Sequence, residues 1–199
     1  MTQRKETSGR PPKPSTLRVI GGRYRHRRLT ALEGNQTRPM LDRMRQTLFD
    51  VLRNQIVGAL FVDLYAGTGA VGIEALSRGA RQVIFVESDP RAATVIEENL
   101  ASLGARGDGL IRCSKVSEVL GGLGGDIVFL GPPYALTREY ETTLATLGQS
   151  PPGLVIAQHP SSLTLSEQYG PLVRSRTITQ GKNCLSFFSS ETEQEASPG

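Results

Sequence analysis

The chain has 199 residues, of which 38% are hydrophobic, and its mean hydropathy is −0.23. This length suits one globular domain with a substantial core, and no apolar run approaches the roughly 20 residues that a membrane helix needs. The basic, proline-rich N-terminus has no apolar stretch after it, so we expect no secretory signal. With only Cys113 and Cys184, we expect neither a disulfide framework nor a metal cluster, and a reducing, cytoplasmic location.

Basic residues gather at the N-terminal end of the chain. Up to Arg53 there are 13 Lys and Arg against 4 Asp and Glu, whereas the remainder has 10 against 15. This asymmetry predicts a polyanion-binding surface attached to an ordinary globular body. A solubilising tail is an adequate alternative explanation for residues 1–14. It explains residues 18–28 poorly, since there the charges alternate with strand-forming residues.

The N-terminal third divides into a tail, a hairpin and a helix. Residues 1–15 are polar and proline-rich, and we expect a disordered basic tail. Residues 17–29 read as two extended runs joined by a Gly-Gly pair, which predicts a β-hairpin with its arginines alternating along one face. A turn at Arg38-Pro39 precedes a predicted helix from Asp42 to about Asn54, because apolar residues recur there on one helical face.

From residue 60 onward, strand and helix patterns alternate every 20 to 25 residues, which is typical of a parallel sheet with crossover helices. The pattern predicts strands at 60–64, 82–87, 110–113, 126–130 and 154–159, and helices at 70–78, 90–103, 116–120 and 137–147. Two last strands, 172–178 and 183–189, would form an antiparallel hairpin at one edge. We therefore divide the chain into a domain over 16–189, with an N-terminal part at 16–57 and a core at 58–189, and an acidic tail at 190–199.

A glycine-rich turn follows the first core strand. Residues 67–72 match the pattern G-x-G-x-x-G, and Glu87 lies 20 residues beyond Gly67, so a dinucleotide site of a nicotinamide-dependent oxidoreductase is one interpretation. Asp63 disfavours it, because a carboxylate at the strand end would repel a pyrophosphate but would suit a cationic ligand. S-adenosylmethionine carries a sulfonium, an amine and a ribose that Glu87 could hold. A turn carboxylate at Asp63 and a solvated acid at Glu87 remain the alternatives.

The fourth core strand runs straight into Gly131-Pro132-Pro133-Tyr134. Two consecutive prolines cannot continue a helix or a sheet interior, so the chain must leave the sheet there and present an aromatic ring. The carboxyl ends of strands are where open α/β sheets place their ligands. The alternative is a rigid strand exit in which Tyr134 only plugs the surface.

Residues 63–69, Glu87 and residues 132–134 occur in the order and spacing of class I S-adenosylmethionine-dependent methyltransferases. Within that superfamily the chain resembles the RsmD-type methyltransferases, which modify a guanine N2 in small-subunit ribosomal RNA. The resemblance extends from about Leu17 to Phe188, and the segments that carry it are residues 18–24, 37–43, 46–49 and 72–80.

The resemblance implies a Rossmann-like, seven-stranded, mostly parallel sheet with an antiparallel last strand, preceded by the hairpin and helix. It implies that S-adenosylmethionine lies over the glycine loop, held by Asp63, Tyr65, Ala66, Gly67, Thr68, Gly69, Glu87 and Ser88. The target amine would lie at Pro132, Pro133 and Tyr134. Ribosomal RNA, free or in a small-subunit assembly particle, would contact Arg18, Arg23, Tyr24, Arg25, Arg27, Arg28, Arg38 and Arg43. We expect a monomer that binds neither metal nor membrane.

Three positions depart from the pattern of this family. Gly131 replaces the acid or amide that accepts a hydrogen bond from the target amine, Lys115 replaces a usual Asp or Asn near the adenine, and Gln46 replaces a usual Glu. Loss of one positioning hydrogen bond costs on the order of 10² to 10³ in rate, by analogy with an oxyanion donor. An RNA-binding or ribosome-assembly factor with weakened or no catalysis is therefore the alternative function. Glu139 or Glu141 could substitute only by folding back.

Overall fold

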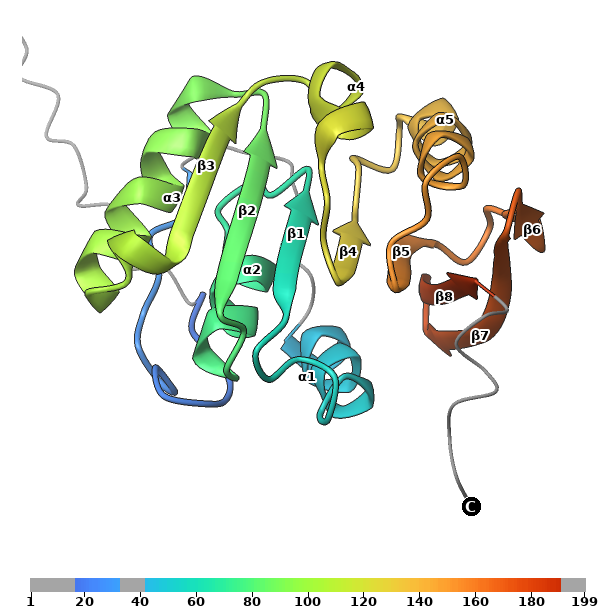
Figure 1. Cartoon of the computed structure of the whole chain (residues 1–199). Coiled ribbons are helices and arrows are strands. Elements are labelled where there is room, and N and C mark those ends of the chain that lie inside the picture. The colour runs from blue at the N-terminus through green and yellow to red at the C-terminus, as the bar shows by residue number, and fades with distance from the viewer. Residues whose placement is uncertain (1–16, 33–41, 191–199) are drawn as a thin grey trace, which may run out of the picture.

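The computed structural model describes residues 17–32 and 42–190, which form one mixed sheet covered by helices (Figure 1). The strands are β1 (Leu60–Leu64), β2 (Gln82–Glu87), β3 (Gly109–Cys113), β4 (Ile127–Leu130), β5 (Leu154–Pro160), β6 (Gln168–Tyr169), β7 (Leu172–Gln180) and β8 (Asn183–Ser190). The helices are α1 (Asp42–Val51), α2 (Ala70–Ser77), α3 (Pro90–Leu103), α4 (Val116–Val119) and α5 (Thr137–Leu147), with short 3₁₀ turns η1 (Arg106–Asp108) and η2 (Leu120–Gly122).

The strand order is β3-β2-β1-β4-β5-β8-β7-β6. β1 to β5 are parallel, and β8 runs antiparallel to both β5 and β7. The predicted mostly parallel sheet with an antiparallel last strand is therefore confirmed, but the count of seven strands is wrong. The eighth strand is β6, whose two residues pair with the start of β7 at the sheet edge and are too few to leave an alternating pattern in the sequence.

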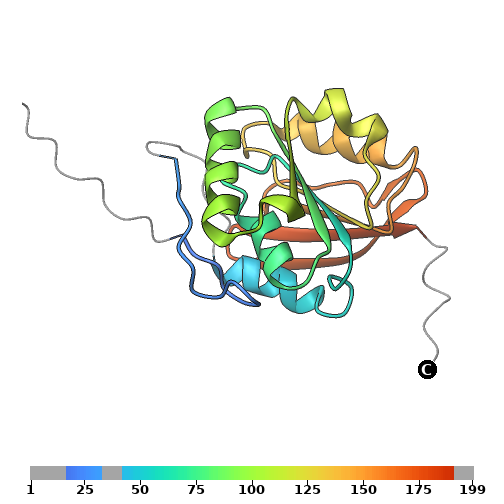
Figure 2. The ribbon, with the colours of Figure 1, turned by 60° about the vertical axis from the view of Figure 1, so that its left-hand side comes forward.

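Two layers of helices enclose the sheet because successive side chains on a strand point to opposite faces. Phe61, Phe85 and Phe129 belong to the apolar core beneath α1, α2 and α3. Val62 and Leu130 belong to the core on the other face, beneath α4 and α5. Figure 2 shows these two helical layers on either side of the strands.

The N-terminal segment forms a shorter hairpin than predicted. Its two arms meet at an antiparallel bridge between Arg18 and Arg28, flanked by backbone hydrogen bonds from Leu29 to Leu17 and from Val19 to Arg27 at 2.9 and 3.0 Å. Residues 21–26 form its turn, which is pinned to α2 because the Arg23 amide donates to the Ser77 carbonyl at 2.8 Å. A Cβ on Gly22 would lie 1.8 Å from that carbonyl oxygen. The predicted alternation of arginines along a strand face is therefore wrong.

A buried carboxylate anchors the same segment. Glu74 in α2 is fully buried, and its two oxygens accept the backbone amides of Ile20 and Gly21 at 2.8 Å each. It also accepts Arg78 Nε at 2.8 Å and lies 3.8 Å from Nε of the buried Arg45 in α1. One charge thus joins the N-terminal segment, α1 and α2.

Candidate active site

Three predicted motifs meet at the carboxyl edge of the parallel strands. Leu64, the last residue of β1, pairs with Val86 in β2 and Leu130 in β4. The next residue of each chain segment is therefore at the same level: Tyr65 before the glycine loop, Glu87 at the end of β2, and Gly131 before the two prolines. This edge is where open α/β sheets bind ligands.

Glycine is needed at different positions of the loop for different structural reasons. Gly67 and Gly69 have φ values of 56° and 77°, a left-handed conformation that glycine adopts without strain. A Cβ on Gly67 would meet no atom within 4 Å, so the loop faces open space at that point. Gly72 instead permits close packing, because a Cβ there would lie 2.3 Å from the ring of Phe85.

Glu87 holds this loop in place. Its Oε2 accepts the Gly67 amide and its Oε1 accepts the Asp89 amide, both at 2.8 Å. The carboxylate is half-buried. The interpretation of Glu87 as a merely solvated strand-end acid is therefore incomplete, since both oxygens already accept hydrogen bonds from the backbone around the site.

Asp63 lies beneath the loop rather than on it. Its side chain is on the α2 face of β1, it is 1% exposed, and its Oδ2 accepts the Gly72 amide at 2.8 Å. Burial raises the pKa of this carboxyl to about 8, the Gly72 hydrogen bond opposes the shift, and the charge of Glu87 adds to it. Among the described residues, the groups that act on this acid are the Gly72 amide and the Glu87 carboxylate, and neither is a cation.

The other predicted cofactor residues lie around the same turn. Ala66 donates its amide to Val86, and the Thr68 carbonyl accepts Nδ2 of Asn99, while Ser88 is exposed. Tyr65 has a left-handed φ of 62°, and its hydroxyl donates to Glu139 at 2.7 Å. Burial raises the pKa of that hydroxyl. Tyr65 therefore ties the loop to α5.

The Pro-Pro-Tyr turn is fixed by two tyrosines. The hydroxyl of the buried Tyr140 lies 3.2 Å from the Pro132 carbonyl oxygen and 2.9 Å from that of Gln158. The Tyr134 hydroxyl donates to Oδ1 of Asn183 and accepts Nε2 of Gln158 at 3.3 Å. Pro133 is exposed and Tyr134 is half-buried. The turn is more than a strand exit, because it is bonded to both β5 and β8.

Gln158, Asn183 and Tyr140 were missed by the sequence analysis. The sequence does contain a signal for Gln158, since it is a polar residue near the carboxyl end of the buried run Leu154–Pro160. It contains no such signal for Asn183, because this residue reaches Tyr134 from a position 49 residues later in the chain.

The residues noted as departures or substitutes have other contacts. Glu139 accepts Tyr65, and Glu141 accepts the Tyr169 hydroxyl at 2.8 Å, so neither hydrogen bond involves Gly131. Lys115 is exposed at the start of α4, where its amide reaches Glu118. Gln46 accepts Arg78 at 3.1 Å.

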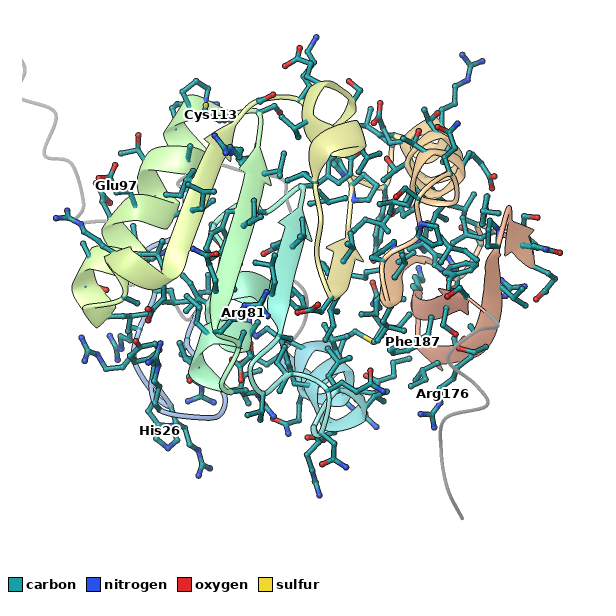
Figure 3. The ribbon with its side chains drawn as sticks, in the orientation of Figure 1. His26, Arg81, Glu97, Cys113, Arg176 and Phe187 are labelled. Carbon is teal, nitrogen blue, oxygen red and sulfur yellow. The ribbon has the colours of Figure 1, made fainter. Side chains whose placement is uncertain are left out.

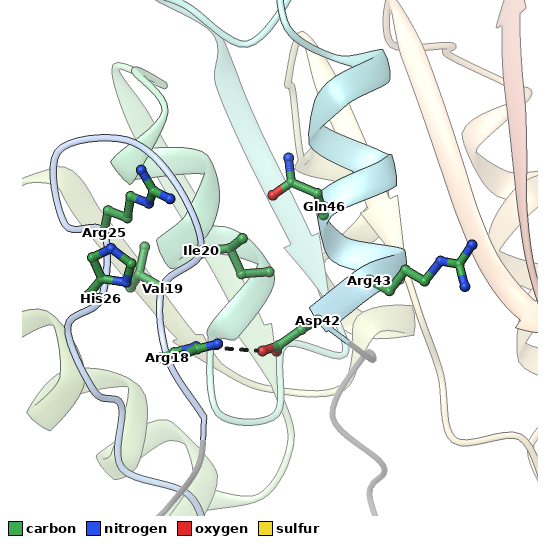
Figure 4. Close-up of a pocket in the computed structure, with 8 residues that line it drawn as sticks. All are labelled: Arg18, Val19, Ile20, Arg25, His26, Asp42, Arg43 and Gln46. Carbon is green, nitrogen blue, oxygen red and sulfur yellow. Dashed lines mark ion pairs between the residues drawn. The ribbon is translucent and has the colours of Figure 1, made fainter.

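Two grooves border α1. The first, about 290 Å³, lies between the N-terminal segment and α1, and its lining includes Arg18, Arg25 and Arg43 (Figure 4). The second, about 420 Å³, joins the start of α1 to the β7–β8 turn and includes Arg43, Met44 and Asn183. Arg43 lines both grooves, and Asn183, which accepts the Tyr134 hydroxyl, lines the second.

The predicted RNA-binding residues fall into two groups. Arg23 pairs with Asp108 at 2.6 Å and lies over the half-buried Tyr24 ring, Arg27 donates to the Ser102 carbonyl, and Arg18 is 3.9 Å from Asp42. The exposed side chains of Arg25, Arg28 and Arg43 make no hydrogen bond or ion pair with any other described residue. Arg38 lies outside the described residues.

The two histidines are not in the site. His159 is buried, and its ring nitrogens contact the Pro160 carbonyl and the Ser186 hydroxyl, so its contacts are structural. His26 is exposed at the N-terminal turn (Figure 3). Within residues 17–32 and 42–190, no three His, Cys, Asp or Glu side chains are grouped to hold a metal ion. None of the described helices has the length and apolar character needed to cross a membrane.

Residues 17–189 match the family model described as "Conserved hypothetical protein 95". The chain belongs to this family. The match confirms the resemblance to RsmD-type methyltransferases, because relatives and neighbours with methyltransferase names cover the same segment.

Two curated relatives are rRNA methyltransferases by name. The chain is 32% identical over 183 residues to "Putative rRNA methyltransferase YlbH" of Bacillus subtilis, covering 86% of this chain and 98% of that protein. It is 38% identical over 119 residues to "Ribosomal RNA small subunit methyltransferase D" of Escherichia coli, covering 59% of this chain and 60% of that protein. Among solved structures, "Putative methyltransferase yhhF" from Escherichia coli superposes with a TM-score of 0.78 at 29% identity, covering 88% and 98% of the two chains. The class I methyltransferase fold is therefore confirmed.

Proposed function

We propose that this protein transfers the methyl group of S-adenosylmethionine to the exocyclic N2 of a guanine in small-subunit ribosomal RNA. The observation that carries the proposal is the alignment of the strand ends at Leu64, Val86 and Leu130. It brings the glycine loop, Glu87 and the Pro-Pro-Tyr turn to one edge. The small-subunit substrate follows the name of the Escherichia coli relative, and a cytoplasmic location is part of the proposal.

The residues present fit this methyl donor. A carboxyl that is buried without a cation, with a pKa of about 8, suits a ligand bearing a sulfonium and an amine. The open space over Gly67 leaves room above the loop. Glu87 would hold the ribose, and Asp63 would act from beneath the loop while it fixes α2 through Gly72.

The bound donor supplies a methyl carbon attached to a positively charged sulfur. The guanine nitrogen would form the new N–C bond with its lone pair, the electron pair of the C–S bond would stay on sulfur, and an N–H proton would leave to water. The protein contributes alignment, which is worth several kcal/mol when the reacting atoms are held in line. The second lone pair of the Pro132 carbonyl and the ring of Tyr134 would orient a base turned out of its stack.

The test is methylation by the purified protein of small ribosomal subunits taken from cells that lack the gene. We expect one labelled guanine in the RNA, identified by mass mapping, and micromolar binding of S-adenosylmethionine in calorimetry. No binding of the donor by wild-type protein would contradict the proposal at its first step.

Removing the ring of Tyr134 should separate stacking from hydrogen bonding. Stacking of a base on an aromatic side chain is worth about 1–3 kcal/mol, so we expect Tyr134→Ala to lower kcat/KM by roughly 10- to 100-fold. Tyr134→Phe keeps the ring and should stay within about fivefold of wild type. Equal losses for both variants would show that the hydroxyl, not the ring, carries the effect.

The exposed arginines should bind RNA phosphates. Each neutralised phosphate adds about 0.7 to 0.9 to the slope of log K against log salt. The double variant Arg25→Ala/Arg43→Ala should therefore reduce the salt slope by about 1.4 to 1.8 in filter-binding titrations, without changing donor affinity. Arg112→Ala, which removes an exposed arginine from β3, is the matched control. An unchanged slope in the double variant would exclude this surface as the RNA contact.

Gly131 favours the second candidate function, an assembly factor that binds RNA without catalysis. This candidate requires wild-type protein to bind RNA but show no turnover. Robust wild-type methylation would eliminate it.

A further inference from the structure

Position 131 lacks the acceptor side chain expected beside the target amine, but the space next to it holds another amide. A Cβ built on Gly131 would lie 3.6 Å from Oε1 of Gln158 and 3.3 Å from the ring of Phe129. An Asp or Asn oxygen would be two bonds beyond that Cβ, in the same neighbourhood as Gln158 Oε1. We propose that Gln158, from β5, supplies the hydrogen-bond acceptor that Gly131 cannot, an inference that rests on the proposed function.

The sheet register places Gln158 there. Leu130 in β4 pairs with Ala157 in β5, so Gly131 and Gln158 are the next positions on two adjacent parallel strands. Phe129 and Ile156, two residues earlier, both face the core beneath α1 to α3. Because side chains alternate along a strand, Gln158 and the missing side chain of residue 131 share that face.

Tyr140 fixes the distance between the two strand ends. Its ring is fully buried, and its hydroxyl contacts the carbonyl oxygens of both Pro132 and Gln158. The backbone of Gln158 is thereby held beside the carbonyl that would accept the target amine.

A relay of hydrogen bonds orients the amide. Nε2 of Gln158 donates to the Tyr134 hydroxyl, which itself donates to Asn183 Oδ1. Since Nε2 faces Tyr134, Oε1 is the end that faces Gly131, and no donor from the described residues hydrogen-bonds to it. An amide oxygen accepts two hydrogen bonds and donates none, which suits an exocyclic N–H.

With Gln158 as an acceptor, the target amine would have two hydrogen-bond acceptors despite the missing side chain at position 131. One amine hydrogen would bond to Gln158 Oε1 and the other to the Pro132 carbonyl, which leaves the nitrogen lone pair aligned with the methyl carbon. The alignment expected from a side chain at position 131 would come from the neighbouring strand, so Gly131 does not imply loss of catalysis.

The first test compares Gln158→Met with Gln158→Glu in methylation of the same subunits. Met keeps the length of the side chain but has no amide oxygen, and loss of one positioning hydrogen bond should lower kcat by about 10²- to 10³-fold, by analogy with an oxyanion donor. Glu retains an acceptor and should stay within about fivefold of wild type. Gln149→Met, at an exposed glutamine of the α5–β5 loop, is the control, and S-adenosylmethionine affinity should be unchanged in all three.

The second test is rescue. Gly131→Asn should restore at least fivefold activity to Gln158→Met, because its amide oxygen would lie in the neighbourhood from which the Gln158 oxygen has been removed. Three results would overturn the role of Gln158 while leaving the proposed function intact. These are wild-type turnover that is unaffected by Gln158→Met, a Gln158→Glu variant as inactive as Gln158→Met, and no rescue by Gly131→Asn. A wild-type protein that neither binds the donor nor methylates RNA would instead overturn the proposed function, and this inference with it.

Discussion

Asp63→Asn should remove the part of the pH dependence of S-adenosylmethionine binding that comes from ionisation of Asp63. The wild-type carboxyl has a pKa of about 8 because it is buried, so below that pH a cationic ligand must displace a proton when it binds. Wild-type affinity should therefore rise with pH by up to about tenfold per unit between pH 6 and 8, and level off above. The asparagine resembles the neutral acid, so the variant should match wild type near pH 6 and bind roughly 10- to 100-fold more weakly at pH 9.

The α-amino group of the ligand titrates near the same pH, so S-adenosylhomocysteine is the necessary comparison. It carries the same amine but a neutral sulfur, and the difference between the two ligands isolates the sulfonium. Calorimetry in buffers of different ionisation enthalpy should detect proton release with S-adenosylmethionine. A pH profile that is unchanged in Asp63→Asn would show that Asp63 does not sense the ligand charge.

Asp63→Asn should weaken ligand binding above pH 8 but should raise the stability of the folded protein. The folded-state pKa of about 8 lies above the ordinary value of 3.8. Between these values the folded protein holds a proton that the unfolded chain has lost, so unfolding free energy falls as pH rises, by up to about 1.4 kcal/mol per pH unit from this group. In the absence of ligand, the Asp63→Asn variant does not undergo this decrease in unfolding free energy and should be more stable than wild type at pH 8, whereas Glu97→Gln, at an exposed acid of α3, should not. Urea unfolding at pH 5 and pH 8 measures the difference.

The sequence could predict elements whose signals are local. The bounds of β1, β2, α3 and α5 agree with the prediction because each is a periodic run ended by a clear break, such as Pro90 at the start of α3 and Gly104 after its end. The motifs of the site were also local, and the parallel topology necessarily brought them to one edge.

The N-terminal segment and the support of the Pro-Pro-Tyr turn depend on distant partners. The alternating charges of residues 23–27 resemble a strand, but the Ser77 carbonyl and hydroxyl bind the backbone amides of Arg23 and Tyr24 in a turn. The same limit applies to Asn183 and Gln158, which reach Tyr134 only through strand pairing late in the chain. Tertiary hydrogen bonds of this kind leave no periodic trace in the sequence.

Glu74→Gln should destabilise the protein and release its N-terminal segment. Arg45 is fully buried, its pKa is lowered by burial, and its Nε and Nη1 have no hydrogen-bond partner among the described residues. Glu74 therefore provides the electrostatic stabilisation of the guanidinium that water would provide at the surface. Removing one partner of a buried ion pair costs about 3–5 kcal/mol. The amide of glutamine would also place a donor against the backbone amide of Ile20 or Gly21.

We expect urea unfolding of Glu74→Gln to show that loss, whereas Glu97→Gln on the exposed face of α3 (Figure 3) should be neutral. Adding Arg45→Met should recover part of the stability, because the second substitution removes the unpaired buried charge. Hydrogen exchange should accelerate in both Glu74 variants at the Ile20 or Gly21 amide that faces the glutamine nitrogen, since glutamine keeps only one of the two acceptor oxygens. If that segment carries the RNA contacts, rRNA affinity should fall in the double variant while donor affinity is kept, which would link a carboxylate buried in α2 to substrate binding at the surface.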